Sequence, residues 1–416
     1  MSAEPATGPR AAARLIASRN FGPYFVGNAT SASGTWFYNL AASVFVYRQT
    51  HSPLLLGVLN FSNFIPMLVL APWTGAAADR FDRRRLLLVT QLASTFLAAV
   101  LAALAWVGLA PVWVVIFFAA LLGIASAYSA PASQALIGSL VPRNELQSAV
   151  ALNSMTYNLA RAIGPALAGL SVKALGIPAS FAINAASYLL LVLGVAVVRP
   201  RRTAKPPRTR LRDSLNLVRA NPRLLALLLI VAAVGFGSDP VNTEAPAFAQ
   251  VFVGHSIDLW AGLIIGAFGL GAVSAAFLLA GRVAGTAQRM AVTLLLLTAG
   301  VAGFSLSPWL RLGFAFLFVG GFGYLASNTS ATSRLQLEVE DNQRGRVMAL
   351  WAVAFMGLRP FASIADGVIA DAFGVRTAGV VLAIPPLVAA AVIVLFLRRG
   401  VPRRRAAPAP YPPPRV

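Results

Sequence analysis

Residues 75–85 read Gly-Ala-Ala-Ala-Asp-Arg-Phe-Asp-Arg-Arg-Arg. This short charged stretch links two long apolar runs, residues 53–77 and 86–108. The hydrocarbon core of a bilayer is about 30 Å thick and needs roughly 20 apolar residues in one helix, and each run is long enough. The pattern predicts two transmembrane helices joined by a charged turn at one face of a membrane.

The same alternation of apolar runs and short polar connections continues along the whole chain. Of its 416 residues 58% are hydrophobic and 11% are charged, with a mean hydropathy of +0.73. A soluble protein would need more polar surface to cover its core. Twelve runs are long enough to cross a bilayer: 22–46, 53–77, 86–108, 112–135, 147–171, 178–198, 224–250, 258–281, 289–307, 312–332, 346–369 and 377–397. We therefore predict an all-α, polytopic membrane protein with twelve transmembrane helices.

The basic residues predict the orientation of these helices. If both termini are cytoplasmic, the inner loops and tails hold 28 of the 34 Lys and Arg, and the outer loops hold four. Lys and Arg accumulate on the cytoplasmic side of membrane proteins. The net charge of +21 therefore indicates anionic lipid headgroups as the partner and not nucleic acid. We expect a multi-pass protein of the bacterial inner membrane with both termini inside.

The chain is expected to divide into two halves. Residues 199–223 are basic and rich in Pro, and they separate six helices in residues 1–198 from six in residues 224–401. A shift of 198 residues places Arg161 on Arg359 and aligns several neighbouring positions. Parallel six-helix repeats are a transporter architecture. The linker is expected to be cytoplasmic, either plain or with a short amphipathic helix, and the tail 402–416 to be disordered.

The composition leaves little material for an enzyme. There is no cysteine, and the two histidines, His51 and His255, fall in connecting loops. This excludes disulfides and thiolate chemistry and leaves almost nothing for a His-based metal site or catalytic triad. We predict that the protein is not an enzyme and uses no cofactor and no metal.

The charged stretch at residues 75–85 resembles the signature loop of the major facilitator superfamily. That loop consists of a Gly, three further residues, Asp-Arg, two further residues and then a basic pair. Here Gly75, Asp79, Arg80, Arg83 and Arg84 match, whereas Asp82 replaces a usual Gly.

The resemblance implies a latch on the cytoplasmic side. Asp79 would be attracted by the N-terminus of the eleventh helix near Arg346, because a helix N-terminus carries partial positive charge. Arg83 or Arg84 would reach acids of the other half, such as Glu340 or Asp341. These contacts would form only when the inner side is closed, and would therefore bias one of two states.

A second motif lies in the fifth predicted helix. Gly164, Pro165 and Gly169, with small residues between them, resemble the helix-five motif of antiporters of the superfamily, although two of its glycines are Ala160 and Ala168 here. Small residues and a proline give a bent helix that packs closely on a neighbour. Generic tight packing remains an equal alternative.

Further matches resemble the branch that contains macrolide-type drug exporters and the enterobactin exporter. They include Ser33-Gly34-Thr35-Trp36, residues 141–149 and Arg344-Gly345-Arg346. Many drug antiporters carry an Arg in the fourth helix that takes part in proton movement. Residues 111–140 contain no Arg, so this role does not transfer.

Polar groups inside the predicted helices are candidates for a central site. Arg161 and Arg359 are the two intramembrane arginines, and each costs about 2.5–3.5 kcal/mol at a helix centre on insertion scales. We expect both to face the interior, either as structural ties or in direct contact with substrate or protons. The other cavity candidates, for each of which helix packing is the competing explanation, are Trp36, Asn39, Tyr128, Tyr157, Tyr324 and Asn328.

Two acids in the span 224–250 are candidates for proton coupling. Asp239 precedes Pro240, and Gly235 and Gly237 are nearby, so the helix is expected to bend or break there. Asp239 is the first candidate, with capping of a resumed helix as the alternative role. Glu244 is the second, unless it lies near enough to the outer surface to be solvated.

Together these features predict a secondary transporter that acts by alternating access. The resemblance favours a proton-coupled exporter of a small apolar or amphipathic molecule, acting as a monomer. The alternatives are an importer of the same fold, a non-transporting membrane sensor and a membrane-embedded enzyme.

Overall fold

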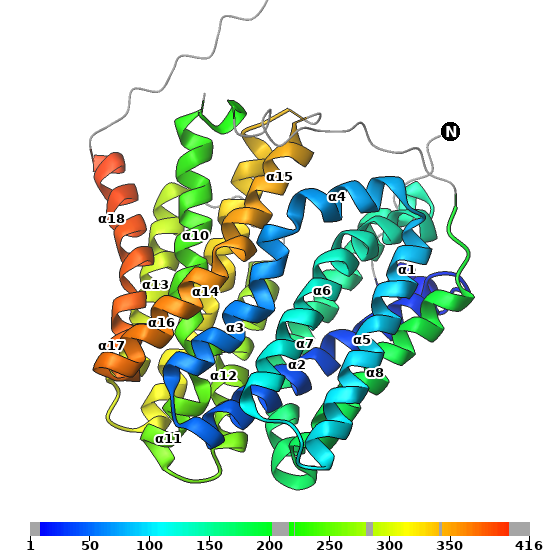
Figure 1. Cartoon of the computed structure of the whole chain (residues 1–416). Coiled ribbons are helices and arrows are strands. Elements are labelled where there is room, and N and C mark those ends of the chain that lie inside the picture. The colour runs from blue at the N-terminus through cyan, green and yellow to red at the C-terminus, as the bar shows by residue number, and fades with distance from the viewer. Residues whose placement is uncertain (1–8, 202–215, 220, 280–285, 341–342, 399–416) are drawn as a thin grey trace, which may run out of the picture.

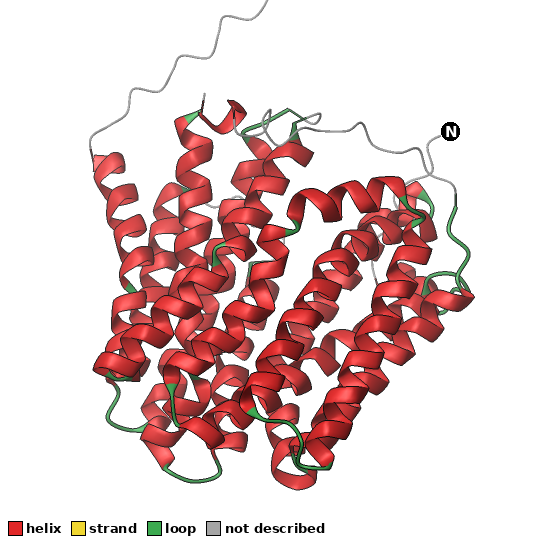
Figure 2. Cartoon of the chain, viewed as in Figure 1, coloured by secondary structure: helices red, strands yellow, loops and turns green. Residues whose placement is uncertain are grey.

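The structure is a computed structural model that describes residues 9–201, 216–219, 221–279, 286–340 and 343–398. Within these ranges the side chains of residues 9–11, 78, 79, 143 and 396–398 are also left undescribed. The described part is helical and has no strand (Figure 2). Residues 402–416, Asp341 and most of the segment 199–223 lie outside it, although residues 216–219 form one helical turn.

The first half of the chain holds eight α-helices and one 3-10 turn among its described residues. Their bounds are α1 Pro9–Ile16, α2 Gly22–Thr50, α3 Pro53–Val69, α4 Ala71–Arg80, α5 Arg83–Trp106, α6 Val112–Leu140, η1 Arg143–Glu145, α7 Leu146–Leu175 and α8 Ile177–Val197. The second half follows the same pattern. Its bounds are α10 Pro222–Thr243, α11 Ala245–Val253, α12 Ile257–Leu278, α13 Ala287–Leu306, α14 Leu310–Leu337, α15 Arg344–Ala352, the π-helix η2 Val353–Gly357, α16 Arg359–Phe373, α17 Val375–Leu382 and α18 Ile384–Arg398.

Ten spans of the described chain are long and apolar enough to cross a membrane, if the bent pair α3–α4 is taken as one. The helices α2 and α7 fail this test although they have 29 and 30 residues, which corresponds to about 44 Å. They fail because they carry polar residues such as Asn28, Ser31, Asn153 and Arg161. Counting both gives the twelve of the sequence analysis, and this number stays a prediction.

The helices run between two ends of the molecule (Figure 1). We call the lower end in that view the hairpin end; there α2 meets α3, α5 meets α6, α7 meets α8 and α16 meets α17. We call the other the terminal end. Within residues 9–197, α2 packs on α7 and α8, and α5 on α6 and α8; within residues 222–398, α13 packs on α14 and α18, and α12 on α14. The most extensive contacts between these two sets are those of α7 with α12 and of α3 with α16.

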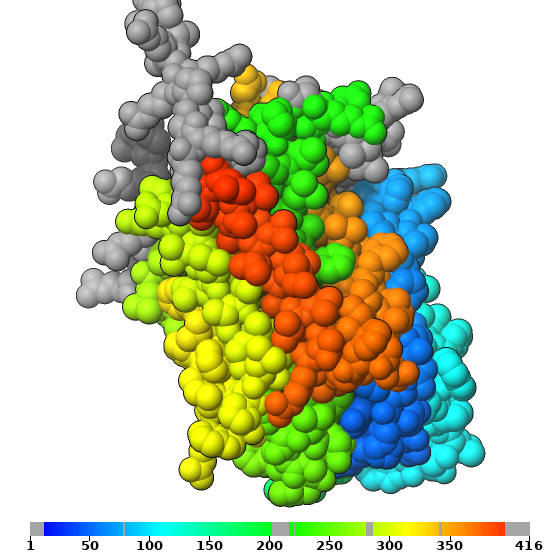
Figure 3. Space-filling model, turned by 90° about the vertical axis from the view of Figure 1, so that its left-hand side faces the viewer, coloured from blue at the N-terminus to red at the C-terminus, as the bar shows by residue number. Residues whose placement is uncertain are grey.

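The outer surface is suited to lipid. The face formed by α13, α16 and α18 (Figure 3) exposes large apolar side chains, among them Val292, Phe361, Leu387 and Val392. In water such a continuous apolar face would be a liability, whereas in a bilayer it is the expected contact surface.

The charged stretch 75–85 is not the loop that its composition predicts. α3 bends by 57° into α4, and α4 continues through Gly75 to Arg80. Only Phe81 and Asp82 are non-helical, and the Asp82 side chain accepts a hydrogen bond from the backbone N–H of Arg85 at 2.8 Å. Asp82, where the signature has Gly, is therefore the N-cap of α5.

The helix break expected at Asp239 occurs five residues later. α10 continues through Asp239 and Pro240 to Thr243, and the chain leaves helical geometry at Glu244 before α11 begins at Ala245. Pro240 is tolerated inside the helix because it removes only one backbone donor, and in a membrane protein the freed carbonyl can be accommodated by its surroundings. Asp239 is thus not a helix cap.

Candidate functional site

A close glycine-mediated contact seals the hairpin end between the two sets of helices. A Cβ atom on Gly169 of α7 would lie 2.7 Å from the backbone oxygen of Asp258, and one on Gly262 of α12 would lie 2.3 Å from that of Pro165. Only glycine allows the two backbones to approach this closely. The helix-five residues Pro165 and Gly169 therefore lie in this contact, and a Cβ on Gly164 would lie 2.8 Å from the Trp36 side chain.

A second contact completes the seal on the other side. A Cβ on Gly57 of α3 would lie 2.5 Å from the backbone oxygen of Ser363 in α16. Two polar contacts lie nearer the hairpins. Arg48 Nη2 is 3.3 Å from Asp258 Oδ2, and the Ser52 hydroxyl donates to Asp371 Oδ1 at 3.0 Å. Both join residues 9–197 to residues 222–398.

Reversing the charge of Arg48 should weaken this seal. Arg48→Glu would place an acid against Asp258, and because the Arg48 side chain is 44% exposed we expect a modest effect of about 1 kcal/mol, or roughly fivefold in the population of the sealed state. Spin labels on Thr50→Cys and Phe373→Cys would report the separation of the hairpin ends. The double variant with Asp258→Arg should restore the wild-type distance distribution; a distribution unchanged in Arg48→Glu alone would show that the pair does not hold the seal.

A cavity of about 330 Å³ lies on the terminal-end side of this seal. The cavity and the seal follow one another along two helices. On α3, Gly57 lies in the seal and Asn60 and Phe64 line the cavity; on α16, Ser363 lies in the seal and Arg359 lines the cavity. Most of its lining comes from α2, α3, α5, α6, α7 and α8. The lining residues are Asn28, Ser31, Ala32, Thr35, Trp36, Asn39, Leu40, Ser43, Asn60, Phe64, Gln91, Ser126, Ser129, Ala130, Ser133, Tyr157, Tyr188, Leu191, Asn242, Pro246, Ile265 and Arg359.

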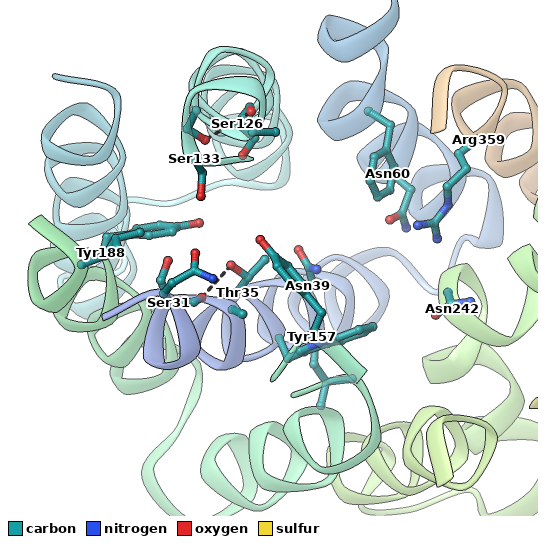
Figure 4. A pocket seen from close by; sticks show the side chains of 18 of the residues that line it. Ser31, Thr35, Asn39, Asn60, Ser126, Ser133, Tyr157, Tyr188, Asn242 and Arg359 are labelled. Carbon is teal, nitrogen blue, oxygen red and sulfur yellow. Dashed lines mark hydrogen bonds between the residues drawn. The ribbon is translucent and has the colours of Figure 1, made fainter. Parts of the chain in front are cut away.

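Four of the residues singled out from the sequence line this cavity: Trp36, Asn39, Tyr157 and Arg359. Figure 4 shows Asn39, Tyr157 and Arg359 directed at a common space from three helices. Tyr128, Tyr324 and Asn328 do not line it. The sequence analysis did not single out the other polar lining residues, such as Ser31, Asn60 and Gln91. Nothing in the sequence distinguishes these serine and amide side chains except that they lie within apolar helices.

Arg161 ties the two sets of helices together beside the cavity. Its Nη1 donates to the Tyr324 hydroxyl of α14 at 2.7 Å, and its guanidinium carbon lies 4.3 Å from the centre of the same ring. The Tyr324 ring in turn packs on Phe268 and Phe355. Arg161 thus faces the protein interior and is held by an aromatic partner and not by an acid.

Arg359 lies between the cavity and a buried acid. Its guanidinium carbon is 4.5 Å from the centre of the Phe64 ring, and its Nε is 4.0 Å from Asp239 Oδ1. Asp239 is fully buried and accepts hydrogen bonds from Thr243 at 2.8 Å and Ser363 at 3.2 Å. At 4.0 Å the ion pair is too long for a hydrogen bond.

Two more carboxyl groups are buried near Asp239. Glu244 and Asp366 are both 0% exposed, and neither has a hydrogen-bond partner in the described part of the chain. Their charges are close enough to interact with each other and with Asp239. The expectation that Glu244 could be solvated is therefore wrong. Asp366 was missed, although an acid inside the predicted span 346–369 was a visible signal.

The basic residues of the signature motif contact their own set of helices. Arg84 donates through Nε to the Val195 carbonyl at 2.9 Å and through Nη2 to that of Ala196, near the C-terminus of α8. Arg83 donates to the Ala135 carbonyl of α6 at 3.3 Å. The Asp79 side chain lies outside the described residues, so its expected contact with the start of α15 stays a prediction.

Among the described residues no group of three or more His, Cys, Asp and Glu is arranged to hold a metal ion. Asp239 in α10, Glu244 just after α10 and Asp366 in α16 are buried and do not line the cavity.

Residues 15–416 match the family model described as transmembrane secretion effector. The chain belongs to this family of major facilitator transporters. The transporter is therefore not an enzyme, and it is a multi-pass membrane protein that carries small molecules.

Characterised relatives of the transporter cover most of its length. It is 27% identical to the staphyloferrin A transporter of Staphylococcus aureus, over 82% of this chain and 87% of that one. It is 25% identical to macrolide efflux protein A of Streptococcus pyogenes, over 85% and 89%, and 24% identical to the multidrug efflux pump Tap of Mycolicibacterium fortuitum, over 89% and 93%.

Solved structures share the transporter's fold. A bacterial homologue of the lysosomal transporter Spinster, in an inward-facing and unoccupied conformation, aligns with a TM-score of 0.73 at 16% identity over 94% of this chain and 98% of that one. The nucleoside transporter NupG aligns with a TM-score of 0.71 at 14% identity over 94% and 100%.

Proposed function

We propose that this transporter exports a small organic molecule from bacterial cells by alternating access coupled to protons. The observation that carries the proposal is the central cavity between the two sets of helices, sealed at one end by the α7–α12 and α3–α16 contacts. A binding space at the middle of a two-bundle protein, closed on one side, is the arrangement that rocking of two bundles requires. The names of the relatives, two efflux proteins and a siderophore transporter, support the direction of export.

The orientation follows from the distribution of basic residues, which favours a cytoplasmic location for both termini and for residues 199–223. The hairpin end is then outside the cell, and the cavity receives its substrate from the cytoplasm. The two units of the rocking motion are residues 1–198 and 224–401, and the protein is proposed to act as a monomer.

The inner latch belongs to the opposite state of the cycle. When the bundles close on the cytoplasmic side, Asp79 would approach the N-terminus of α15, and Gly75, Arg80, Arg83 and Arg84 would accompany it. The contacts of Arg84 with carbonyl groups of α8 support this proposal, because they hold it on its own bundle while the hairpin end is sealed.

Protons are proposed as the coupling ion, carried by Asp239, Glu244 and Asp366. A buried carboxyl group without a donor or counter-ion costs far less in its protonated, uncharged form than as a carboxylate. Glu244 and Asp366 have no such partner in the described chain, whereas Asp239 has two hydroxyl donors and a counter-ion at 4.0 Å. Loading and release of a proton here would change the charge beside the α3–α16 seal, where Asp366 lies on the same helix as Ser363.

Accessibility of the cavity tests alternating access. The chain has no cysteine, so Ser129→Cys places a single thiol in the cavity lining. A membrane-impermeant maleimide should label it rapidly in inverted vesicles and slowly in right-side-out vesicles. Ala13→Cys in α1, outside the cavity, reports the vesicle orientation. Fast labelling of Ser129→Cys only from the outside would contradict the proposal.

Direction and energy source need a transport measurement. Cells that express the chain are exposed to a broad compound panel, with and without an uncoupler that collapses the proton gradient. Lower accumulation that disappears with the uncoupler supports proton-driven export. Higher accumulation would instead identify an importer of the same fold.

A further inference from the structure

The described polar groups of the cavity wall are neutral except for one positive charge. Hydroxyl and amide groups from Ser31, Asn39, Asn60, Gln91 and Tyr157 face the space, and none of the described residues that line it is Asp, Glu, Lys or His. Among these described lining residues the single charged group is the guanidinium of Arg359. Specificity in a binding pocket comes from a few placed polar groups, and here the only charge among them is positive.

Arg359 has hydrogen-bonding capacity left over. It makes no hydrogen bond with the residues that the structure describes, and its contacts are the face of the Phe64 ring and the distant carboxylate of Asp239. Its side chain is 20% exposed, and Figure 4 shows the guanidinium beside Asn60 at the edge of the space. A planar group with five N–H donors and unused positions is suited to holding a carboxylate or a phosphate in a bidentate pair.

The surrounding charges favour an anion over a cation. Arg161 lies close enough to Arg359 for the two charges to interact, and its hydrogen bond goes to Tyr324 and not to an acid. Of the three buried acids only Asp239 lies against Arg359; Glu244 and Asp366 do not face the cavity. A cationic molecule in the cavity would meet Arg359 before Asp239, because Asp239 is fully buried and does not line the cavity.

From this geometry we infer that the transported molecule is an anion that carries a carboxylate, phosphate or similar group together with several hydroxyl or amide groups. The acidic group binds Arg359, and the polar wall of α2, α3, α5 and α6 binds the remainder. This inference rests on the proposed transport function and narrows the small amphipathic substrate expected from the sequence to an anionic one. A cavity of about 330 Å³ admits a small molecule of this kind.

Matched sets of probes test the sign of the preferred charge. Glucuronate, glucose and glucosamine form one set, and 4-hydroxybenzoate, 4-hydroxybenzamide and 4-hydroxybenzylamine form another. Titration calorimetry on the full chain in detergent should show the anion of each set binding roughly tenfold or more tightly than its neutral partner, and the cation weakest, as expected for a charge-assisted pair. Equal or tighter binding of the cations, or no measurable binding of any of the six probes, would overturn the inference.

Substitution of Arg359 locates the effect. Arg359→Gln should remove the preference for the anions and leave the weaker binding of the neutral probes. Because this change leaves Asp239 buried without a counter-charge, the double variant Arg359→Gln with Asp239→Asn serves if the single variant does not fold. Arg376→Gln, which changes the same charge outside the cavity, should keep the preference. An anion preference that survives without Arg359 would place the anion elsewhere and refute the assignment.

Binding by purified protein needs no gradient, so the two proposals fail separately. Anion binding without gradient-driven transport would leave the substrate class standing and reject the proposed function. Proton-driven transport of cations would support the proposed function and reject the inferred anionic substrate.

Discussion

Replacing Asp239 with asparagine is expected to abolish transport driven by a pH gradient. Thr243 and Ser363 donate to different oxygens of Asp239; asparagine keeps one of these acceptors and its NH2 group can donate to the other hydroxyl, but it cannot carry or release a proton. In proteoliposomes with an imposed pH gradient we expect at least a tenfold loss of the initial rate, with insertion and thermal stability close to those of the wild type. The rate should also lose its dependence on pH, since the neutral amide does not titrate.

Two comparisons make this experiment decisive. Glu338→Gln changes an acid in an exposed ion pair with Arg223, and it should leave the rate unchanged. Asp366→Asn and Glu244→Gln test the two neighbouring carboxyl groups. Proton-driven transport with an unchanged pH profile in Asp239→Asn would show that this acid is structural and would move the coupling role to Asp366 or Glu244.

Adding one methyl group at Gly262 is expected to prevent the hairpin end from sealing. The new Cβ would lie 2.3 Å from the backbone oxygen of Pro165 and 3.1 Å from the Cα of Gly169, and neither atom can move without moving a helix. Gly262→Ala should therefore shift the protein away from the sealed state and reduce transport at least tenfold, because a rocking cycle needs both states. The Ser129→Cys thiol should become reactive from the outside.

Gly138→Ala is the matched control. It makes the same change in α6, where the nearest atom to a new Cβ is a Leu146 methyl group at 4.0 Å. Alanine has the higher helix propensity, so a general effect of the substitution would favour folding at both positions. Normal transport by Gly262→Ala would show that the α7–α12 contact can yield without loss of function.

The helices were predictable because bilayer thickness imposes a strong and simple constraint on composition. The predicted spans and the observed helices agree to within a few residues at most ends, as for 178–198 and Ile177–Val197. The main errors lie where local chemistry competes with hydropathy. The charges of Asp79 and Arg80 suggested a loop after residue 77, yet both residues belong to the helix α4. Pro240 suggested a break, yet α10 continues to Thr243.

The site was predictable only in part, because hydropathy gives depth in the membrane but not direction around a helix. Arg359 was found because a buried guanidinium is costly and therefore conspicuous. Tyr324 was expected in the cavity and instead binds Arg161 beside it. Serines such as Ser31 and Ser129 line the cavity without any distinguishing sequence signal. For Asp366 and Glu244 the tertiary structure was needed to show that no donor among the described residues reaches them.

The wall of the cavity and the buried acids occupy different parts of the chain. Most of the cavity wall belongs to helices before residue 200, whereas Asp239, Glu244 and Asp366 belong to α10, its C-terminal end and α16. Under the proposed mechanism, a serine or asparagine of α2 or α6 could change without disturbing the groups that harness the gradient. Such a layout allows the substrate specificity to change by substitutions in the first half of the chain while the proposed proton-coupling acids of the second half are retained.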